Sequence, residues 1–253
     1  MNEIIKISHY SEKSARVTVG NKLVASKAKP GQFVIIKFDP KGLRIPFPIV
    51  DCRPVEGELD VIIHRADGLD EILPLIQEGG VLPDLLGPLG TPAVIEENKT
   101  VLFIGDGSGF VPLLPLIKAS RDRGCKVLSI VSEQSSQTKC LLGDINSMCH
   151  ELSVASEDSV PQIMRQWVDL FHPDKIICSG PTLLVKHLTE IARAHGIPAE
   201  CVLNMLMIDG IGICGVCRVM VAGKQKQTCI DGPIFNAWDV DFDYILNRQR
   251  SFV

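Results

Sequence analysis

The sequence predicts a chain that joins an all-β domain to a parallel α/β domain and ends in a cysteine-rich segment. Three observations support this fold class. Short strand-like segments broken by Gly and Pro fill roughly the first 95 residues, and buried strands then alternate with amphipathic helices from Thr100 onward. After Gly196 the alternation stops, and Gly and Cys become frequent. A chain of 253 residues exceeds the usual size of one domain, so we expect units at residues 1–97, 98–200 and 201–253.

The first unit has the pattern of a small antiparallel β-barrel. Its strand-like segments are IIKISHY, SARVTVG, QFVIIKF and LDVIIHR. Runs of this length, rich in Val and Ile and separated by turn residues, are typical of antiparallel sheets. One helix is expected to interrupt the barrel around Asp70 to Glu78.

The second unit has the pattern of a Rossmann-like domain. The apolar run TVLFIG meets the glycine-rich DGSG, an amphipathic stretch follows from Val111 to Arg123, and KVLSIVS is a second buried strand. A helix over Val160 to Phe171, the strand KIICSG and a helix over Pro181 to His195 continue the alternation. Such β-α-β repeats predict a parallel sheet covered by helices.

Composition excludes several classes of function. With 45% hydrophobic residues, 22% charged residues and a net charge of −4, the chain lacks the basic surplus that nucleic-acid binding requires. Its N-terminus MNEIIKISHYSEKSARV has no apolar signal region, and no apolar run reaches the ~20 residues that span a bilayer. We therefore expect a cytoplasmic protein with no nucleic-acid or membrane partner. No serine–histidine–acid arrangement or paired carboxylates indicate a hydrolase.

The cysteines indicate a metal or redox site. Their number is nine, an odd count, and two of them form a tight CGVC. The order Asp209-x4-Cys214-x2-Cys217-x11-Cys229 has the ligand spacing of plant-type [2Fe–2S] ferredoxins, with Asp in place of the first cysteine. Nearby glycines permit the tight turns that such a loop needs; they are Gly210, Gly212 and Gly215.

Other interpretations of these cysteines stay open. Cys201 is a rival to Asp209 as the fourth ligand, and the same residues could hold a tetrahedral zinc ion or no metal at all. The isolated cysteines are expected to pack in the core; they are Cys52, Cys125, Cys140, Cys149 and Cys178.

Several motifs resemble one protein family over nearly the whole chain. They are KPGQFV at 29–34, RIPFPI at 44–49, GPLG at 87–90, IGDGSGFVP at 104–112, SGPTLLVK at 179–186, and the pair MIDGIGICGVCRV and TCIDGPIF. The chain resembles the flavin-containing electron-transfer subunits allied to dihydroorotate dehydrogenase subunit K. It is more similar to the small (alpha) subunit of NADH-dependent ferredoxin:NADP oxidoreductase and sulfide dehydrogenase, in which an Asp cluster ligand is known.

The resemblance implies a ferredoxin-reductase-like fold with a flavin-binding barrel, an NAD(P)-binding domain and a C-terminal [2Fe–2S] segment. NAD(H) or NADP(H) would give a hydride to FAD, and the cluster would pass single electrons to a partner. That partner would be a larger flavin and iron–sulfur subunit, with ferredoxin a further candidate. Trp238 and Phe235 would be interface anchors or core residues.

Site residues follow from the matching motifs. For FAD, the resemblance implies that Arg44 neutralises the pyrophosphate, that Pro46, Phe47, Pro48 and Ile49 run beside the isoalloxazine, and that Ile62, Ile63, His64 and Arg65 flank the adenosine side, with Gly68 in the pyrophosphate-binding turn. For the nicotinamide dinucleotide, it implies contacts from Gly105, Gly107, Gly109, Ser179, Gly180 and Pro181. For iron, it implies the ligands Asp209, Cys214, Cys217 and Cys229.

The sequence departs from the family pattern in the flavin and nucleotide regions. Pro48 stands where Thr or Ser is usual and cannot make the hydroxyl's hydrogen bond to the flavin. The segment HRADGLDEI adds acidic residues near the expected phosphate, and neither SEQSSQTK nor VASEDSV supports a 2′-phosphate. The alternative function is therefore a non-catalytic conduit or assembly subunit that keeps the cluster but has lost nicotinamide binding, and flavin with it in the extreme case. A zinc-stabilised binding module is a third and more distant class.

Overall fold

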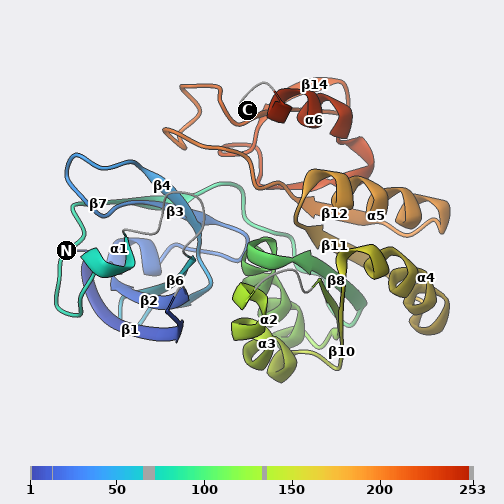
Figure 1. Ribbon diagram of the computed structural model, residues 1–253, viewed down its shortest axis with the longest axis horizontal. Helices are drawn as coiled ribbons and strands as arrows, with labels where there is room; N and C mark the ends of the chain where they lie inside the picture. Colours follow the sequence, from blue (N-terminus) through green and yellow to red (C-terminus); the bar gives the residue numbers. More distant parts are fainter. Residues whose placement is uncertain (1, 13, 65–71, 133–135, 251–253) are drawn as a thin grey trace.

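The protein consists of a β-barrel beside a helix-covered sheet, with a C-terminal segment that crosses over both (Figure 1). The computed structural model describes residues 2–12, 14–64, 72–132 and 136–250. No helix within those ranges is long and apolar enough to cross a bilayer. This is the ferredoxin-reductase-like arrangement that the sequence predicts.

The N-terminal unit is antiparallel throughout. Its two sheets have the orders β1-β2-β6-β5 and β4-β3-β7. In the first sheet Val17 lies opposite Val61, and both are fully buried against the second sheet. The elements are β1 (Glu3–Ser11), β2 (Ser14–Gly20), α1 (Lys22–Ala25), β3 (Phe33–Lys37), β4 (Ile45–Pro48), β5 (Asp51–Arg53), β6 (Glu58–His64) and β7 (Asp84–Leu89).

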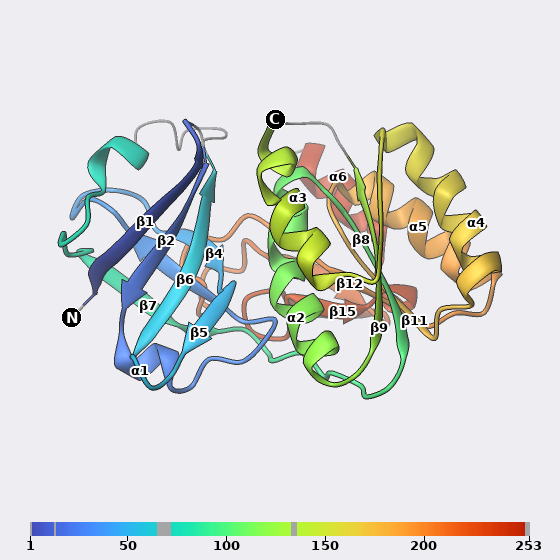
Figure 2. The ribbon, with the colours of Figure 1, turned by 90° about the horizontal axis from the view of Figure 1, so that it is seen from below.

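The second unit is a doubly wound sheet. Its strand order is β10-β9-β8-β11-β12-β15, in which the first five strands are parallel and β15 is antiparallel. Helices α2 and α3 cover the face toward the barrel, whereas α4 and α5 cover the far face (Figure 2). The strands are β8 (Thr100–Asp106), β9 (Lys126–Ser132), β10 (Glu151–Ala155), β11 (Lys175–Ser179), β12 (Ala199–Val202) and β15 (Ile234–Asn236). The helices are α2 (Leu114–Asp122), α3 (Ser136–Met148), α4 (Val160–Phe171) and α5 (Thr182–Ala194).

Two helix predictions need correction, and one helix is an addition to them. The helix expected over 111–123 begins later, as α2, because Pro112 and Pro115 hold the preceding Gly107–Leu113 in a 3-10 helix, η2. The helix expected over 70–78 is wrong in its described part, where only a 3-10 turn, η1 (Leu73–Leu75), forms before Ile76 becomes extended. Helix α3 was not predicted. The helix α4 has the predicted bounds, and η3 (Glu157–Ser159) precedes it.

The C-terminal segment does not form a separate body. Strand β12 spans the expected boundary at residue 200, and β15 returns to pair with it after the cysteine-rich loop. The remaining elements are the hairpin β13 (Arg218–Val221) and β14 (Lys224–Gln227), η4 (Ala237–Asp239) and α6 (Phe242–Arg250). Phe235 is buried in the core, and the half-buried Trp238 has the Arg193 guanidinium 5.8 Å from its ring. Both aromatic residues therefore contact the core, Phe235 within it and Trp238 at its edge.

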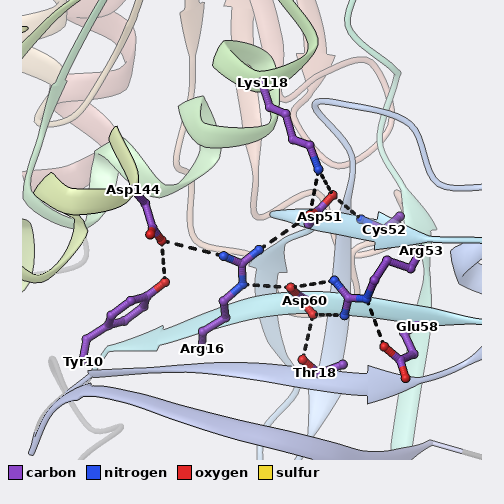
Figure 3. Close-up of polar contacts among 10 residues, drawn as sticks. All are labelled: Tyr10, Arg16, Thr18, Asp51, Cys52, Arg53, Glu58, Asp60, Lys118 and Asp144. Carbon is purple, nitrogen blue, oxygen red and sulfur yellow. Dashed lines mark hydrogen bonds and ion pairs between the residues drawn. The ribbon is translucent and has the colours of Figure 1, made fainter. Parts of the chain in front are cut away.

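A charged network joins the barrel to the helices α2 and α3 (Figure 3). The Lys118 ammonium lies 2.7 Å from the Asp51 carboxylate, and the Tyr10 hydroxyl donates to Asp144 over 2.7 Å. Arg16 lies between them, 3.7 Å from each of these two carboxylates. Burial and the Asp144 carboxylate raise the pKa of Tyr10 to about 12. The network thus fixes how the two units face each other.

A buried carboxylate anchors this network in the barrel. Asp60 is 3% exposed and accepts from Arg16 over 2.8 Å, from Thr18 over 2.9 Å and from Arg53. Burial alone would raise the pKa of Asp60, but the hydrogen bonds from Arg53 and Thr18 and the charge of Arg16 outweigh burial and lower it.

Candidate functional site

The loop after Met207 is organised by one carboxylate. Asp209 accepts the backbone N–H groups of Ile211 over 3.0 Å, of Ile213 over 3.1 Å and of Cys214. Burial alone would raise the pKa of Asp209, but these N–H donors lower it. The loop therefore wraps around an ionised oxygen donor at the position that the spacing identified.

The four predicted iron ligands lie in two pairs. The Cys214 thiol is in hydrogen-bonding contact with Asp209. The Cys217 and Cys229 sulfurs lie 3.3 Å apart and are both buried. Burial and the neighbouring Cys217 raise the pKa of Cys229 to about 12, while the backbone N–H of Gly212 donates to the Cys229 sulfur. Each pair brings together two ligands that the plant-type spacing would place on one iron.

The spacing of the two buried sulfurs is close to that of two ligands on one metal ion. Tetrahedral coordination with metal–sulfur bonds of about 2.3 Å separates two sulfurs by roughly 3.8 Å, so a 3.3 Å pair needs only a small opening. Within the described ranges, no three His, Cys, Asp or Glu side chains converge on a point where a single ion could bind. Cys201 lies on β12 opposite Cys178 and is fully buried in the sheet, outside both pairs.

Close packing against the barrel holds the loop in place. Gly210 has φ +68°, and a Cβ added there would lie 2.0 Å from the Cδ1 atom of Ile35 on β3. The backbone N–H of Thr91, just after β7, donates to the Gly232 carbonyl. The loop therefore lies directly on the sheet that carries the RIPFPI strand.

A pocket opens where all three parts of the chain meet. The barrel, the start of α2 and the C-terminal segment all contribute to its lining, which consists of Gly31, Gln32, Phe33, Pro46, Pro48, Pro112, Pro115, Asn204, Met207 and Pro233. Met207 is only two residues before Asp209. Because one residue extends the chain by at most ~3.6 Å, the Cα atoms of Met207 and Asp209 are within about 7 Å. The pocket wall and the loop of residues 209–217, which the spacing predicts to be an iron–sulfur loop, are thus one continuous segment.

Comparison with known proteins agrees with this geometry. The family model for the iron–sulfur cluster binding domain of dihydroorotate dehydrogenase B matches residues 204–241. A Thermotoga maritima protein named as a homolog of the dihydroorotate dehydrogenase B (NAD(+)) electron transfer subunit is 34% identical, over 100% of this chain and 92% of that protein. The chain belongs to this electron transfer subunit family. A subunit of that name from Shouchella clausii is 30% identical over 94% of this chain and 96% of its own length.

Two solved structures have the same fold as this chain. A chain from the study titled "Insights into flavin-based electron bifurcation via the NADH-dependent reduced ferredoxin-NADP oxidoreductase structure" superposes with a TM-score of 0.87. It is 32% identical, over 99% of this chain and 93% of that one. The ferredoxin reductase of carbazole 1,9a-dioxygenase superposes with a TM-score of 0.64 at 18% identity, covering 78% of this chain and 63% of that chain, and so shares the fold.

The residues of RIPFPI divide between two environments. Pro46 and Pro48 line the pocket, whereas Phe47 and Ile49 are buried in the barrel core, where Phe47 packs edge-on against Phe38 with ring centroids 5.7 Å apart. Alternate residues of a strand face opposite sides, so only the two prolines are available to a ligand in this pocket.

The other residues assigned to the flavin are dispersed. Arg44 is exposed and paired with Asp84 at 3.0 Å. Ile62 and Ile63 are buried in two different cores. The His64 Nδ1 lies 2.9 Å from the Ser14 hydroxyl, its buried Nε2 has no partner within the described ranges, and burial lowers its pKa to about 4. Arg65 and Gly68 lie outside the described residues.

The residues assigned to the nicotinamide dinucleotide do come together. Strands β8 and β11 are neighbours, and Gly109 approaches Gly180 so closely that an added Cβ would lie 2.7 Å from the Gly180 Cα. Gly105, the last but one residue of β8, lies against Phe110, and Gly107 begins η2 with φ +49°. Ser179 donates to the Val202 carbonyl over 3.3 Å, and Pro181 precedes α5. These two strand ends form the switch point at which Rossmann-like sheets bind ligands.

One acidic residue, Asp106, lies at these two strand ends. Asp106 is 8% exposed, and its Oδ1 atom has no hydrogen-bond partner in the described part of the chain. Burial, together with the charges of Asp106 and Asp158, raises the pKa of Glu157. The strand end therefore presents negative charge where a pyrophosphate would approach.

Sequence reasoning missed most of the pocket lining. The residues without an earlier assignment include Asn204, Met207, Pro115 and Pro233. Pro115 and the segment of Asn204 and Met207 are far apart in the sequence, and nothing in the local pattern indicates that they line one cavity. Only the assembled fold brings them to one cavity.

Proposed function

We propose that this chain is the electron-transfer subunit of a flavin and iron–sulfur oxidoreductase. FAD would occupy the pocket between the barrel, α2 and the C-terminal segment, and a [2Fe–2S] cluster would bind to Asp209, Cys214, Cys217 and Cys229. The observation that carries the proposal is the continuity between Met207 in the pocket wall and Asp209 in the loop. In functional terms, residues 1–97, 98–200 and 201–253 would supply the flavin, nucleotide and cluster sites.

The side chains suit these two groups. Two ligand pairs, with a backbone N–H donated to the Cys229 sulfur, suit a cluster of two irons in which each pair would bind one iron. Pro46 and Pro48 would lie against a flat apolar ring. FAD, when bound, supplies the exchange between two-electron and one-electron chemistry.

A partner subunit would exchange electrons at the exposed side of the loop. Cys214 is exposed while Cys217 and Cys229 are buried, so the loop presents one ligand outward. The relatives are named as electron transfer subunits, which supports a complex with a larger catalytic subunit. Ferredoxin is a further candidate acceptor.

Asp106 favours a second candidate function. A buried carboxylate at the dinucleotide cradle, with Glu157 and Asp158 near it, opposes the two negative charges of a pyrophosphate. In the second function the chain is a conduit that keeps the cluster and takes its electrons from a partner instead of from NAD(P)H. Asp106→Gly would then create NADH binding that the wild-type chain lacks, and Asp106→Asn would separate the effect of charge from that of size.

The test is an ultraviolet–visible spectrum of the anaerobically purified chain with quantification of FAD, iron and labile sulfide. Flavin bands together with two irons per chain, bleached by NADH, support the leading function. Iron and sulfide without flavin support the conduit, and a colourless zinc protein contradicts both.

A further inference from the structure

The pocket offers very few hydrogen-bond donors. Five of its lining residues are prolines, which have neither a backbone N–H nor a polar side chain; they are Pro46, Pro48, Pro112, Pro115 and Pro233. Phe33, Met207 and Gly31 add no polar side chain. Of the lining residues, only Gln32 and Asn204 have side chains that donate hydrogen bonds.

Gln32 is already committed to the fold. Its Nε2 donates to the Gly90 carbonyl over 2.8 Å, and its Oε1 accepts from the Lys29 backbone N–H over 3.0 Å. The side chain is buried, so releasing it would leave polar groups of Lys29 and Gly90 without partners. Gln32 therefore links the backbone at Lys29 to the backbone at Gly90 within the barrel.

Asn204 is uncommitted. It is exposed at the pocket, and its carboxamide makes no hydrogen bond to any described part of the chain. A carboxamide both donates and accepts, which matches the alternating donors and acceptors along the polar edge of an isoalloxazine. Asn204 is also five residues before Asp209, on the segment that joins the pocket to the iron–sulfur loop.

We propose that Asn204 makes the hydrogen bond to the polar edge of the flavin that Pro48 cannot make. Both residues line the same pocket, and a polar edge enclosed by proline would otherwise lose the hydrogen bonds that it makes to water. Asn204 is then a positioning residue that sets the affinity and the potential of the flavin. This inference rests on the proposed function.

The test compares Asn204→Leu with Leu206→Ala, an exposed control in the same segment. FAD is titrated into flavin-free full-length protein, and the absorption maximum and midpoint potential of the bound flavin are measured. Loss of one hydrogen bond predicts FAD binding roughly 2- to 10-fold weaker in Asn204→Leu, with a shifted flavin spectrum and potential. The iron content is expected to stay at the wild-type value, which also reports that the variant is folded. The control should behave as wild type.

A rescue experiment makes the assignment specific. Pro48→Ser restores a hydroxyl beside the same pocket, so it should recover part of the affinity in the Asn204→Leu background. Asn204→Asp, which keeps the acceptors but loses the donors, should shift the flavin potential even if Asn204→Leu folds poorly. Wild-type affinity and spectrum in both Asn204 variants would overturn the inference alone. A wild-type chain that binds no FAD would overturn the proposed function, and the inference with it.

Discussion

Gly210→Ala tests whether the iron–sulfur loop depends on its contact with the barrel. The new Cβ would lie 2.0 Å from the Ile35 Cδ1, and Ile35 is buried at 1% exposure, so the two elements must separate. A non-glycine residue at φ +68° costs about 1–2 kcal/mol, and overpacking adds about 1–3 kcal/mol. We expect a total loss of about 2–5 kcal/mol in urea unfolding, together with less iron per chain.

The matched control is Gly223→Ala, in the turn between β13 and β14. Gly223 has φ +70° but no atom within 4 Å of an added Cβ, so only the backbone cost of about 1–2 kcal/mol applies. Ile35→Val removes the clashing Cδ1 and should recover part of the loss in the double variant with Gly210→Ala. Equal losses in the two alanine variants, or no recovery with Ile35→Val, would refute the reasoning.

Three further predictions concern protonation and iron ligation. The pKa of His64 is about 4 in the folded state and about 6.5 in the unfolded state, so protonation favours unfolding. The free energy of unfolding should therefore fall by up to about 3 kcal/mol as the pH drops from 6.5 to 4. His64→Gln should flatten this part of a profile of melting temperature against pH. Asp60→Asn should cost about 3 kcal/mol near neutral pH. Because the folded pKa of Asp60 is lowered, the difference from wild type should shrink as the pH falls below the unfolded value of about 4, where the unfolded carboxylate binds a proton and the folded one does not; a constant difference down to pH 3 would contradict the ion-pair explanation. Cys217→Ala should abolish the cluster spectrum, whereas Cys201→Ala should keep two irons per chain, and loss of iron in the second variant would restore Cys201 as a ligand.

Elements with a strong local pattern could be predicted from the sequence. The bounds of α4 follow from its apolar period, and the long strands of both units from their Val- and Ile-rich runs. Helix α3 was missed although Leu141 and Ile145 repeat at helical spacing and are fully buried. Its first turn is polar, and Gly143 lies in its middle, so local propensity hid the signal that tertiary packing uses.

Site residues, likewise, could be predicted where they share one loop, but not where only the fold brings them together. The positions of Asp209 and of the CGVC pair could be predicted because ligands on one loop must have a fixed spacing. Phe47 and Ile49 were assigned to the flavin because the motif is contiguous, although a strand turns alternate residues away from any one ligand. Asn204 carries no local pattern at all, and only the fold brings it to Pro48.

Helix α2 contributes residues both to the pocket and to the charged network between the two units. Pro115 in its first turn lines the pocket, and Lys118, one turn later, pairs with Asp51 of the barrel. A rigid helix cannot move one of these residues without the other, so the ion pair between Lys118 and Asp51 restrains where Pro115 lies relative to the barrel. Because Asn204 and Met207 line the same pocket on the segment that leads into Asp209, a shift of α2 would change the pocket without breaking its covalent connection to the iron–sulfur loop.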